Sequence, residues 1–531
     1  MKGRLKTLTV LIAACVQLAR ADGLYHEAHR PQFHFSPPQQ WMNDPNGLVY
    51  DHGEYHLFYQ HNPYSNKWGP MHWGHAVSSD LVHWDNLPIA LYPDRNGTIF
   101  SGSAVLDVAN TSGFGLRAKP PLVAIYTYHD HLREHLGETG FQSQGLAYSL
   151  DRGRNWVKYA GNPVLTNSEV RDFRDPKVFW YAPDRKWIMA LAVADHVAFY
   201  SSHNLKHWMH ESDFGKEWGS HGGVWECPDL FAATVEGTSL RKYVLLVSIN
   251  PGGPNGGSAT QYFVGDFDGH RFTLDSALQL KLKTDATEPA AGQAQIDRAL
   301  WLDYGTDDYA GSTWSGGAPG DARQLFIGWM NNWVYANEVP TERWRSAMTV
   351  PRELRLFQTE RGLELHSTPV RELDSLRKES KPIAARSSAG PMDLTELAGA
   401  KGGLMELELN LDSRSADTVE LRFANASGES TTFRVNKIKR RYELDRSASG
   451  TVAFNAAFGD VQVAPILGSA QALKLRIYMD HSSLEIFLNE GETVFTSLVF
   501  PSVPYNLISL KSDQEIELRA GTIYELQSIW K

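Results

Sequence analysis

Short runs of apolar and aromatic residues alternate with turn-rich segments between Asp22 and about residue 360. Long helical periodicity is almost absent there, and Gly, Pro, Asn and Asp separate the runs. The clearest runs lie at 55–59, 186–191, 243–247 and 325–329. Because short β-forming runs between turn signals are typical of strands, this pattern predicts an all-β domain over 22–360.

A weak internal repeat divides this region further. Its first copy, Ser79-Asp80-Leu81-Val82-His83-Trp84, returns loosely at 149–156, at 202–208 and more faintly at 265–272. The copies follow one another at intervals of roughly 50 to 70 residues, enough for a four-stranded sheet with its loops. With a fifth unit over about 301–350, we predict a five-bladed β-propeller. A β-sandwich with chance matches to the repeat is the alternative.

The pattern changes after Leu354. Residues 361–390 are rich in charge and predict a linker with one short helix. From there, over 391–531, strands such as 404–409 and 473–478 alternate cleanly between apolar and polar positions. Half-buried antiparallel strands of this kind predict a β-sandwich domain. We expect a structural role for it, with polymer binding or dimerisation as alternatives.

Composition fits a globular enzyme. The 531 residues include 51 Lys and Arg against 61 Asp and Glu, a formal net charge of −10, without a basic run. Such a chain is a poor candidate for binding nucleic acid or an anionic membrane. The length favours two domains rather than one core. We therefore expect a small-molecule or polymeric substrate, and a monomer or homodimer.

Residues 1–21 have the features of a signal peptide. Lys2, Arg4 and Lys6 precede a short apolar stretch, and Ala19-Arg20-Ala21 fits a cleavage site. The stretch is shorter than the roughly 20 residues that span a bilayer. We predict a secreted protein whose mature chain keeps Cys227 as its single cysteine. The sequons at Asn96, Asn110 and Asn425 fit a glycosylated exterior in a eukaryotic host.

The densest group of candidate catalytic residues is Trp41-Met42-Asn43-Asp44-Pro45-Asn46-Gly47, which we expect to be a turn leading into a strand. A single Asp or Asn in a turn is usually structural. Here, however, one carboxylate lies among several amides. Amide donors favour the ionised form and lower the pKa of Asp44, as a carboxylate nucleophile requires.

Two further acids lie in unusual contexts, Asp175 in Arg174-Asp175-Pro176 and Glu226 in Trp225-Glu226-Cys227-Pro228. The aromatic surroundings of Glu226 favour its protonated form. One ionised and one protonated acid is the division that glycoside hydrolysis needs. Each acid precedes the first strand of a repeat unit, and in a propeller those strands line the central channel. We therefore expect the three acids to converge.

Together and in this order, the three motifs resemble the signature of glycoside hydrolase family 32, the β-fructofuranosidases. These include invertases, exo-inulinases, levanases and related fructosyltransferases. The resemblance covers essentially the whole mature chain, including a sandwich strand at 478–487. It implies a five-bladed propeller followed by a β-sandwich, and a retaining mechanism without metal or organic cofactor.

The resemblance also implies roles for individual residues. Asp44 matches the nucleophile, Glu226 the general acid/base, and Asp175 the acid that stabilises the transition state. Trp68 matches an aromatic residue of exo-acting members, which remove terminal fructose. In the pocket, Trp329 is an alternative to Trp333. The implied substrate-binding residues are Trp41, Asn43, Gln60, Trp68, Phe100, Ser101, Arg174 and Trp333.

Several alternatives remain beside this interpretation. His131-Leu132-Arg133-Glu134-His135 matches an inverted zincin motif, but its neighbouring glycines favour a polar loop. A fructosyltransferase would share every residue named above and differ in how acceptors compete with water. A non-catalytic fructan-binding protein is the rival from another class. Preference among sucrose, raffinose, inulin and levan stays open.

Overall fold

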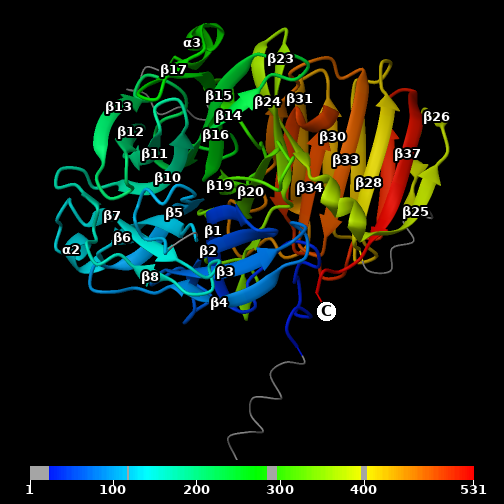
Figure 1. Ribbon diagram of the computed structural model, residues 1–531. Coiled ribbons are helices and arrows are strands. Elements are labelled where there is room, and N and C mark those ends of the chain that lie inside the picture. Colours follow the sequence, from blue (N-terminus) through cyan, green and yellow to red (C-terminus); the bar gives the residue numbers. More distant parts are fainter. Residues whose placement is uncertain (1–22, 117–118, 284–295, 396–402, 531) are drawn as a thin grey trace, which may run out of the picture.

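The computed structural model describes residues 23–116, 119–283, 296–395 and 403–530. It contains a five-bladed β-propeller, coloured blue to green in Figure 1, beside a β-sandwich coloured yellow to red. The predicted fold class is therefore confirmed, whereas the signal peptide predicted at 1–21 lies outside these ranges. No helix within the described ranges is long and apolar enough to cross a membrane.

Five sheets form the propeller. In each sheet the first strand in the chain lies at the channel, and the following main strands lie successively farther from it. Blade one contains β1 (Gln40–Asp51), β2 (Glu54–Asn62), β3 (His72–Ser78) and β4 (Asp85–Leu91). Blade two contains β5 (Thr98–Leu106), β6 (Leu122–His129), β7 (Gln142–Ser149), β8 (Val157–Lys158) and β9 (Leu165–Thr166). Blade three contains β10 (Phe173–Tyr181), β11 (Lys186–Val193), β12 (His196–Ser202) and β13 (Met209–Phe214).

The last two blades complete the ring. Blade four contains β14 (Val224–Thr234), β15 (Arg241–Asn250), β16 (Ala259–Phe267), β17 (Phe272–Leu274) and β18 (Leu300–Trp301), with helix α3 (Ser276–Leu282) after β17. Blade five contains β19 (Tyr309–Thr313), β20 (Gln324–Met330), β22 (Ala347–Met348), β23 (Arg352–Thr359) and β24 (Gly362–Pro369). The segment between β20 and β22 contains a further strand, β21 (Trp344–Arg345), which pairs in parallel with β1. This pairing connects blade five to blade one and closes the ring.

The repeat seen in the sequence is the turn between the third and fourth strands of a blade. In three blades an indole N–H closes this turn on a carbonyl three residues earlier: Trp84 on Leu81 (3.0 Å), Trp156 on Gly153 (2.9 Å) and Trp208 on Leu205 (2.9 Å). The accepting residue has a positive φ each time, as does Gly269 in blade four. The sequence pattern therefore reflects one turn geometry used four times.

The fifth blade lies later in the chain than the expected 301–350. Residues 300–301 pair with β16 of blade four, while β24 of blade five ends at Pro369. The segment 361–390 accordingly differs from the expected linker: only 3₁₀-helix η1 (Arg371–Leu376) connects the domains. β25 (Arg377–Ile383) and β26 (Arg386–Ser388) then pair with the sandwich. Because β25 is an edge strand with exposed charged side chains, its sequence resembles a linker.

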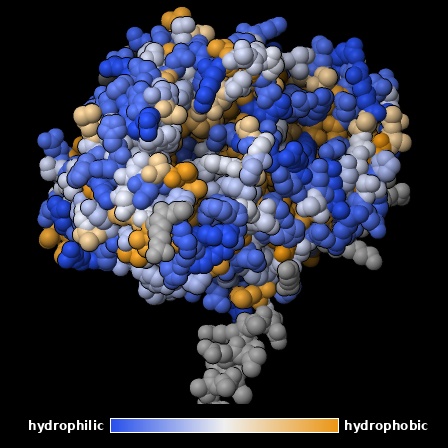
Figure 2. All heavy atoms as spheres, in the orientation of Figure 1, coloured by the Kyte–Doolittle hydropathy of each residue, from blue (hydrophilic) through white to orange (hydrophobic). Residues whose placement is uncertain are grey.

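Two antiparallel sheets form the sandwich. One contains β25, β26, β28 (Met405–Asp412), β33 (Ala472–Asp480), β34 (Ser483–Leu488), β35 (Thr493–Leu498) and β37 (Ile516–Leu526), with 3₁₀-helix η2 (Asn489–Gly491) after β34. The other contains β27 (Met392–Asp393), β29 (Thr418–Ala424), β30 (Ser430–Asn436), β31 (Arg441–Ala448), β32 (Gln462–Pro465) and β36 (Leu507–Ser512). Their facing apolar side chains are buried, whereas the molecular face in Figure 2 is mainly hydrophilic.

The two domains meet through buried charge. Arg352, at the start of β23, donates through Nη1 to Asp303 Oδ2 and Asp308 Oδ2, at 3.0 Å each, and through Nη2 to Glu485 of β34. All four side chains are fully or almost fully buried. Because a buried charge without its partner costs several kcal/mol, these residues stabilise one arrangement of the domains.

His34 lies at the same interface, between two sandwich carboxylates. Its Nδ1 is 2.8 Å from Asp480 Oδ2 and its Nε2 is 2.8 Å from Glu485 Oε1, with all three side chains buried. Burial alone would lower the pKa of His34, but the two carboxylates raise it to about 9. His34 is therefore protonated at neutral pH.

We expect this histidine to make stability depend on pH between about 6.5 and 9. Since its folded-state pKa lies above the ordinary value, its contribution is complete below pH 6.5 and is lost as the pH rises through 9. The shift corresponds to about 3 kcal/mol. In thermal unfolding from pH 6 to 10, His34→Gln should melt lower at pH 6 and lose this part of the pH dependence.

A matched control is His83→Gln, because His83 pairs with Asp80 at an exposed site. This variant should keep the pH dependence of the wild type. If His34→Gln retained the full loss of stability between pH 6.5 and 9, the assignment to His34 would be wrong.

Candidate active site

Each innermost strand of the propeller has a β-bulge at the same level of the channel. A bulge interrupts the hydrogen-bond ladder and redirects a side chain. Proline fits such positions because it has no N–H to leave unpaired: Pro176 and Pro228 lie inside two of the bulges, and Pro45 directly follows a third. The register shifts fall between Met42 and Pro45, Ile99 and Gly102, Arg174 and Lys177, Glu226 and Asp229, and Tyr309 and Ser312.

These bulges correct the predicted position of the acids. Asp44, Asp175 and Glu226 lie inside β1, β10 and β14 rather than before them, and 41–47 is part of a continuous strand rather than a turn. The Asn, Pro and Gly residues that suggested a turn instead shape a bulge. The acids still belong to blades one, three and four, as expected.

The bulges open into a cavity of about 310 Å³. Trp41 is not among its lining residues: it is fully buried, and its Nε1 donates to Asn43 Oδ1 at 2.7 Å. The other predicted site residues all line the cavity, namely Asn43, Asp44, Gln60, Trp68, Phe100, Ser101, Arg174, Asp175, Glu226 and Trp333. The cavity is also lined by residues that were not predicted from the sequence, namely His129, Glu134, Phe141, Gln142, Arg171, Asp172 and Asn250.

Asp44 is held by a hydrogen bond to each carboxylate oxygen. Oδ1 accepts from Asn43 Nδ2 at 2.9 Å and Oδ2 accepts from Ser101 Oγ at 2.6 Å. Burial raises the pKa of Asp44, the Ser101 and Asn43 bonds oppose the rise, and the charge of Glu226 adds to it. The expected lowering was therefore wrong, because burial outweighs the local donors.

Asp175 and Asp44 both lie next to the sulfur atom of Cys227. Cys227 Sγ lies 3.7 Å from Asp44 Oδ2 and 3.6 Å from Asp175 Oδ2, and the Cys227 N–H donates to Asp175 Oδ2 at 3.1 Å. Burial raises the pKa of Asp175 to about 7, with Arg174 opposing and the neighbouring acids adding to the rise. The residue also has a φ of 65°, within the bulge.

Glu226 is bound by two residues from neighbouring blades. Its Oε1 accepts from Arg174 Nε (3.2 Å) and Nη2 (3.0 Å), and its Oε2 accepts from the Tyr309 hydroxyl. Arg174 also donates to Asp172 Oδ1 at 2.6 Å. Tyr309 was not predicted from the sequence, where its one signal was an aromatic residue at the start of the fifth inner strand. The bulge on β19 lies beside it.

Aromatic side chains form the walls of the cavity. Trp68 is 39% exposed and lies edge-on to Phe100 (6.1 Å between ring centroids), while Phe100 stacks on His129 (4.2 Å). Trp333 packs against the buried Trp41 at 5.9 Å. Aromatic faces beside amide and carboxylate groups suit a sugar, which presents C–H surfaces and hydroxyls.

The segment with the zincin-like spacing is a one-turn helix, α2 (His131–His135), rather than the expected polar loop. Asp130 caps it by accepting from the N–H groups of Leu132 and Arg133. Asp130 stands directly before the helix in the sequence, whereas the prediction of a loop rested on the neighbouring glycines.

Metal ligation at this helix would involve His129, His131 and Glu134, whose ligand atoms lie within 4.8 Å of one another. In the structure, hydrogen bonds occupy both ring nitrogens of His129. Gln142 accepts from the Phe173 N–H (2.8 Å), so its amide nitrogen faces His129 Nδ1 (3.1 Å). The proton of His129 is then on Nε2, which donates to Glu134 Oε2 at 2.8 Å. A metal would need that nitrogen unprotonated.

Comparison with known proteins gives consistent matches over both domains. The chain matches the model for the glycosyl hydrolases family 32 N-terminal domain over 34–369 and that for the family 32 C terminal over 372–527. It is 45% identical to a levanase of Bacillus subtilis (98% of this chain, 74% of that protein). It is 40% identical to an extracellular exo-inulinase of Aspergillus niger (93% of each).

A solved structure agrees in fold. The β-fructofuranosidase of Schwanniomyces occidentalis, complexed with fructosyl-erythritol, aligns with a TM-score of 0.79 at 31% identity. The alignment covers 96% of this chain and 99% of that one.

The crowded carboxylates predict that Asp175→Asn is stabilising. Because the folded-state pKa of Asp175 is about 7 and its ordinary value is 3.8, ionisation costs stability as the pH rises between these values. The variant should gain up to about 4 kcal/mol in the free energy of unfolding at pH 8, and less toward pH 4. Chemical unfolding at both pH values measures this, with exposed Asp195→Asn as control. A less stable variant at pH 8 would contradict it.

Proposed function

The chain belongs to glycosyl hydrolase family 32, and from this premise we propose that its pocket releases terminal fructose from β-D-fructofuranosides through Asp44, Asp175 and Glu226. It is a glycoside hydrolase of the β-fructofuranosidase type. The observation that carries the proposal is the convergence of three carboxylates, from the inner strands of three blades, on one cavity with aromatic walls.

In the proposed mechanism Asp44 attacks the anomeric C2 of the terminal fructosyl unit while Glu226 protonates the leaving oxygen. The resulting fructosyl-enzyme is then hydrolysed by water that Glu226 activates as a base, so configuration is retained. The bonds from Asn43 and Ser101 to Asp44 support its orientation for attack. Arg174 and Tyr309 hold Glu226 in the same way.

Asp175 binds fructose hydroxyls in this proposal and stabilises charge as the bond to C2 breaks. Asn43, Gln60 and Arg174 supply further polar contacts, since all three line the cavity. Gln60 Nε2 already donates to Asn46 Oδ1 at 2.7 Å, which leaves its carbonyl oxygen available to a hydroxyl donor. Trp68 and Phe100 provide apolar surface.

Exo-action is supported by the closed inner end of the cavity. Past the acids, the channel narrows to a space of about 20 Å³ lined by residues that include Pro45, Pro176 and Pro228. A polymer cannot pass through such a gap, so a chain end must enter from the outer mouth. Trp68 lies at that mouth, in the position that the family resemblance assigns to exo-acting members.

Secretion is part of the proposal. The features of residues 1–21 and the extracellular description of the Aspergillus relative support it. The net charge of −10 favours an uncharged substrate over nucleic acid or an anionic membrane. Fructosyl transfer stays a second candidate, because transfer needs the same acids and differs in the acceptor.

Product analysis with sucrose, raffinose, inulin and levan tests the function. Free fructose from all four substrates would indicate a broad exo-fructosidase, and fructose from sucrose and raffinose alone an invertase. Kestoses accumulating at high sucrose would favour transfer. Absence of any product from all four would remove the proposed function.

Asp44→Ala should lower kcat on sucrose by roughly four orders of magnitude or more, because the nucleophile is lost. Circular dichroism checks the fold, and Asp195→Asn is the control at an exposed position. Retention is tested separately, by NMR identification of the first-formed fructose anomer. Substantial residual turnover of Asp44→Ala, or inversion at C2, would exclude Asp44 as the nucleophile.

A further inference from the structure

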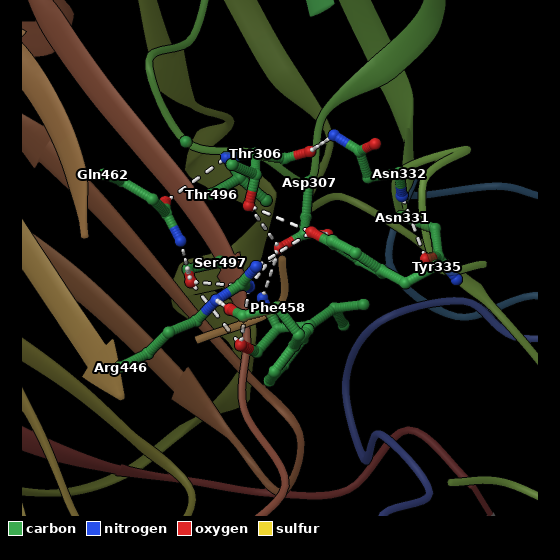
Figure 3. Close-up of polar contacts among 12 residues, drawn as sticks. Thr306, Asp307, Asn331, Asn332, Tyr335, Arg446, Phe458, Gln462, Thr496 and Ser497 are labelled. Carbon is green, nitrogen blue, oxygen red and sulfur yellow. Dashed lines mark hydrogen bonds and ion pairs between the residues drawn. The ribbon is translucent and has the colours of Figure 1, made fainter. Parts of the chain in front are cut away.

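A buried arginine of the sandwich contacts Asp307 and Tyr335 of the propeller (Figure 3). Arg446 lies on β31 and is fully buried. It donates through Nη1 to Asp307 Oδ2 (2.6 Å), through Nη2 to the Tyr335 hydroxyl (2.9 Å) and through Nε to the Phe458 carbonyl (2.6 Å). Its Nη1 also donates to Ser497 Oγ (3.2 Å) and to the Leu498 carbonyl (3.0 Å), so one guanidinium joins two propeller residues to three sandwich residues.

Tyr335 and Asp307 connect this arginine to a tight turn of blade five. The Tyr335 hydroxyl donates to Asp307 Oδ1 at 2.7 Å, and the Asn332 carbonyl accepts from the N–H of Tyr335 (3.1 Å) and of Ala336 (2.8 Å). Asn332 Nδ2 in turn donates to the Thr306 carbonyl at 2.8 Å. Residues 332–336 are thus attached at both ends to the segment that faces the sandwich.

Trp333 lies inside this turn and lines the cavity. Its N–H donates to Ser258 Oγ at 3.2 Å, and its ring packs 4.9 Å from Trp329 and 5.9 Å from Trp41. Because Asn332 and Tyr335 flank Trp333, the position of the Tyr335 hydroxyl limits where the indole can lie.

We propose that Arg446 and Tyr335 are positioning residues for the fructosyl pocket, which they act on through Trp333. The inference rests on the proposed function and deepens it, because it gives the sandwich a part in substrate binding. A fully bonded, buried polar network is rigid, and a small displacement of a substrate-positioning group costs large factors in rate. If the sandwich only stabilised the fold, substitutions of Arg446 or Tyr335 would lower the free energy of unfolding but would not selectively weaken substrate binding at Trp333.

Tyr335→Phe is the sharpest test, because it removes the hydroxyl and keeps the ring that packs on Phe458 (5.2 Å). We expect kcat/KM for sucrose to fall about tenfold. In a Trp333→Ala background the same substitution should cause no further loss, because the wall it positions is gone. Arg446→Lys keeps a charge for Asp307 and should show a smaller loss, also absent in that background.

Tyr505→Phe is the matched control. It removes an equally buried hydroxyl, which bonds to Thr431 and to the Ser449 carbonyl within the sandwich, and should leave kcat/KM unchanged. Two results would overturn the proposal. One is that Tyr335→Phe lowers kcat/KM equally with and without Trp333, and the other is that it lowers neither kcat/KM nor the affinity for fructose. If Tyr335→Phe does not fold, Arg446→Lys decides by the same comparison.

Calorimetric binding of fructose to the same variants separates this inference from the proposed function. Weaker fructose binding by Tyr335→Phe, again only where Trp333 is present, supports positioning even if the wild type does not hydrolyse sucrose. Hydrolysis by the wild type with unchanged kcat/KM and unchanged fructose affinity in Tyr335→Phe removes the positioning role alone.

Discussion

The candidate active site depends on a break in hydrogen-bonded pairing that all five inner strands share. A regular strand at the channel would send alternate side chains into the blades and keep its backbone groups on the ladder. Beside the bulges, Asp44, Ser101, Asp175 and Glu226 line one cavity instead, and Tyr309 bonds to Glu226 from the fifth strand. Asp175, Cys227 and Ala310 have positive φ values there, which cost of order 1 kcal/mol or more each. The regular ladders on both sides of each bulge hold this strained backbone in place.

Crowding of negative charge is the second consequence of this geometry. Asp44, Asp175 and Glu226 are brought together beside Arg174, which bonds to Glu226 and lies 3.9 Å from Asp175. Burial and mutual repulsion therefore raise the pKa of both aspartates. Such an arrangement opposes folding, and it persists because the surrounding blades bury large apolar cores. A bound sugar replaces lost hydration with hydroxyl donors, which favours the charged forms.

The sequence predicted the fold class and the acids because both leave local signals. Pro45, Pro176 and Pro228 mark the bulges, and the Trp-closed turn recurs with one residue in the left-handed region. Other features depend on contacts distant in sequence. The burial of Trp41, the Tyr309–Glu226 bond and the place of Glu134 in the pocket depend on contacts between segments far apart in the chain. The edge strand β25 was missed because exposed charge on an edge strand looks the same as charge in a linker.

The interface between the domains also helps to position the candidate site, because one short segment of the chain contacts both the sandwich and Glu226. The Tyr304 N–H donates to the Val494 carbonyl (2.8 Å), and Asp303 and Asp307 accept from the N–H groups of Thr496 and Leu498 (2.9 Å each). The segment is thereby fixed along sandwich strand β35. Two residues after Asp307, the Tyr309 hydroxyl donates a hydrogen bond to Glu226. A shift of β35 would therefore move a hydrogen-bond donor of the proposed acid/base. The sandwich thus constrains the end of the channel where the three acids meet, as well as covering a blade.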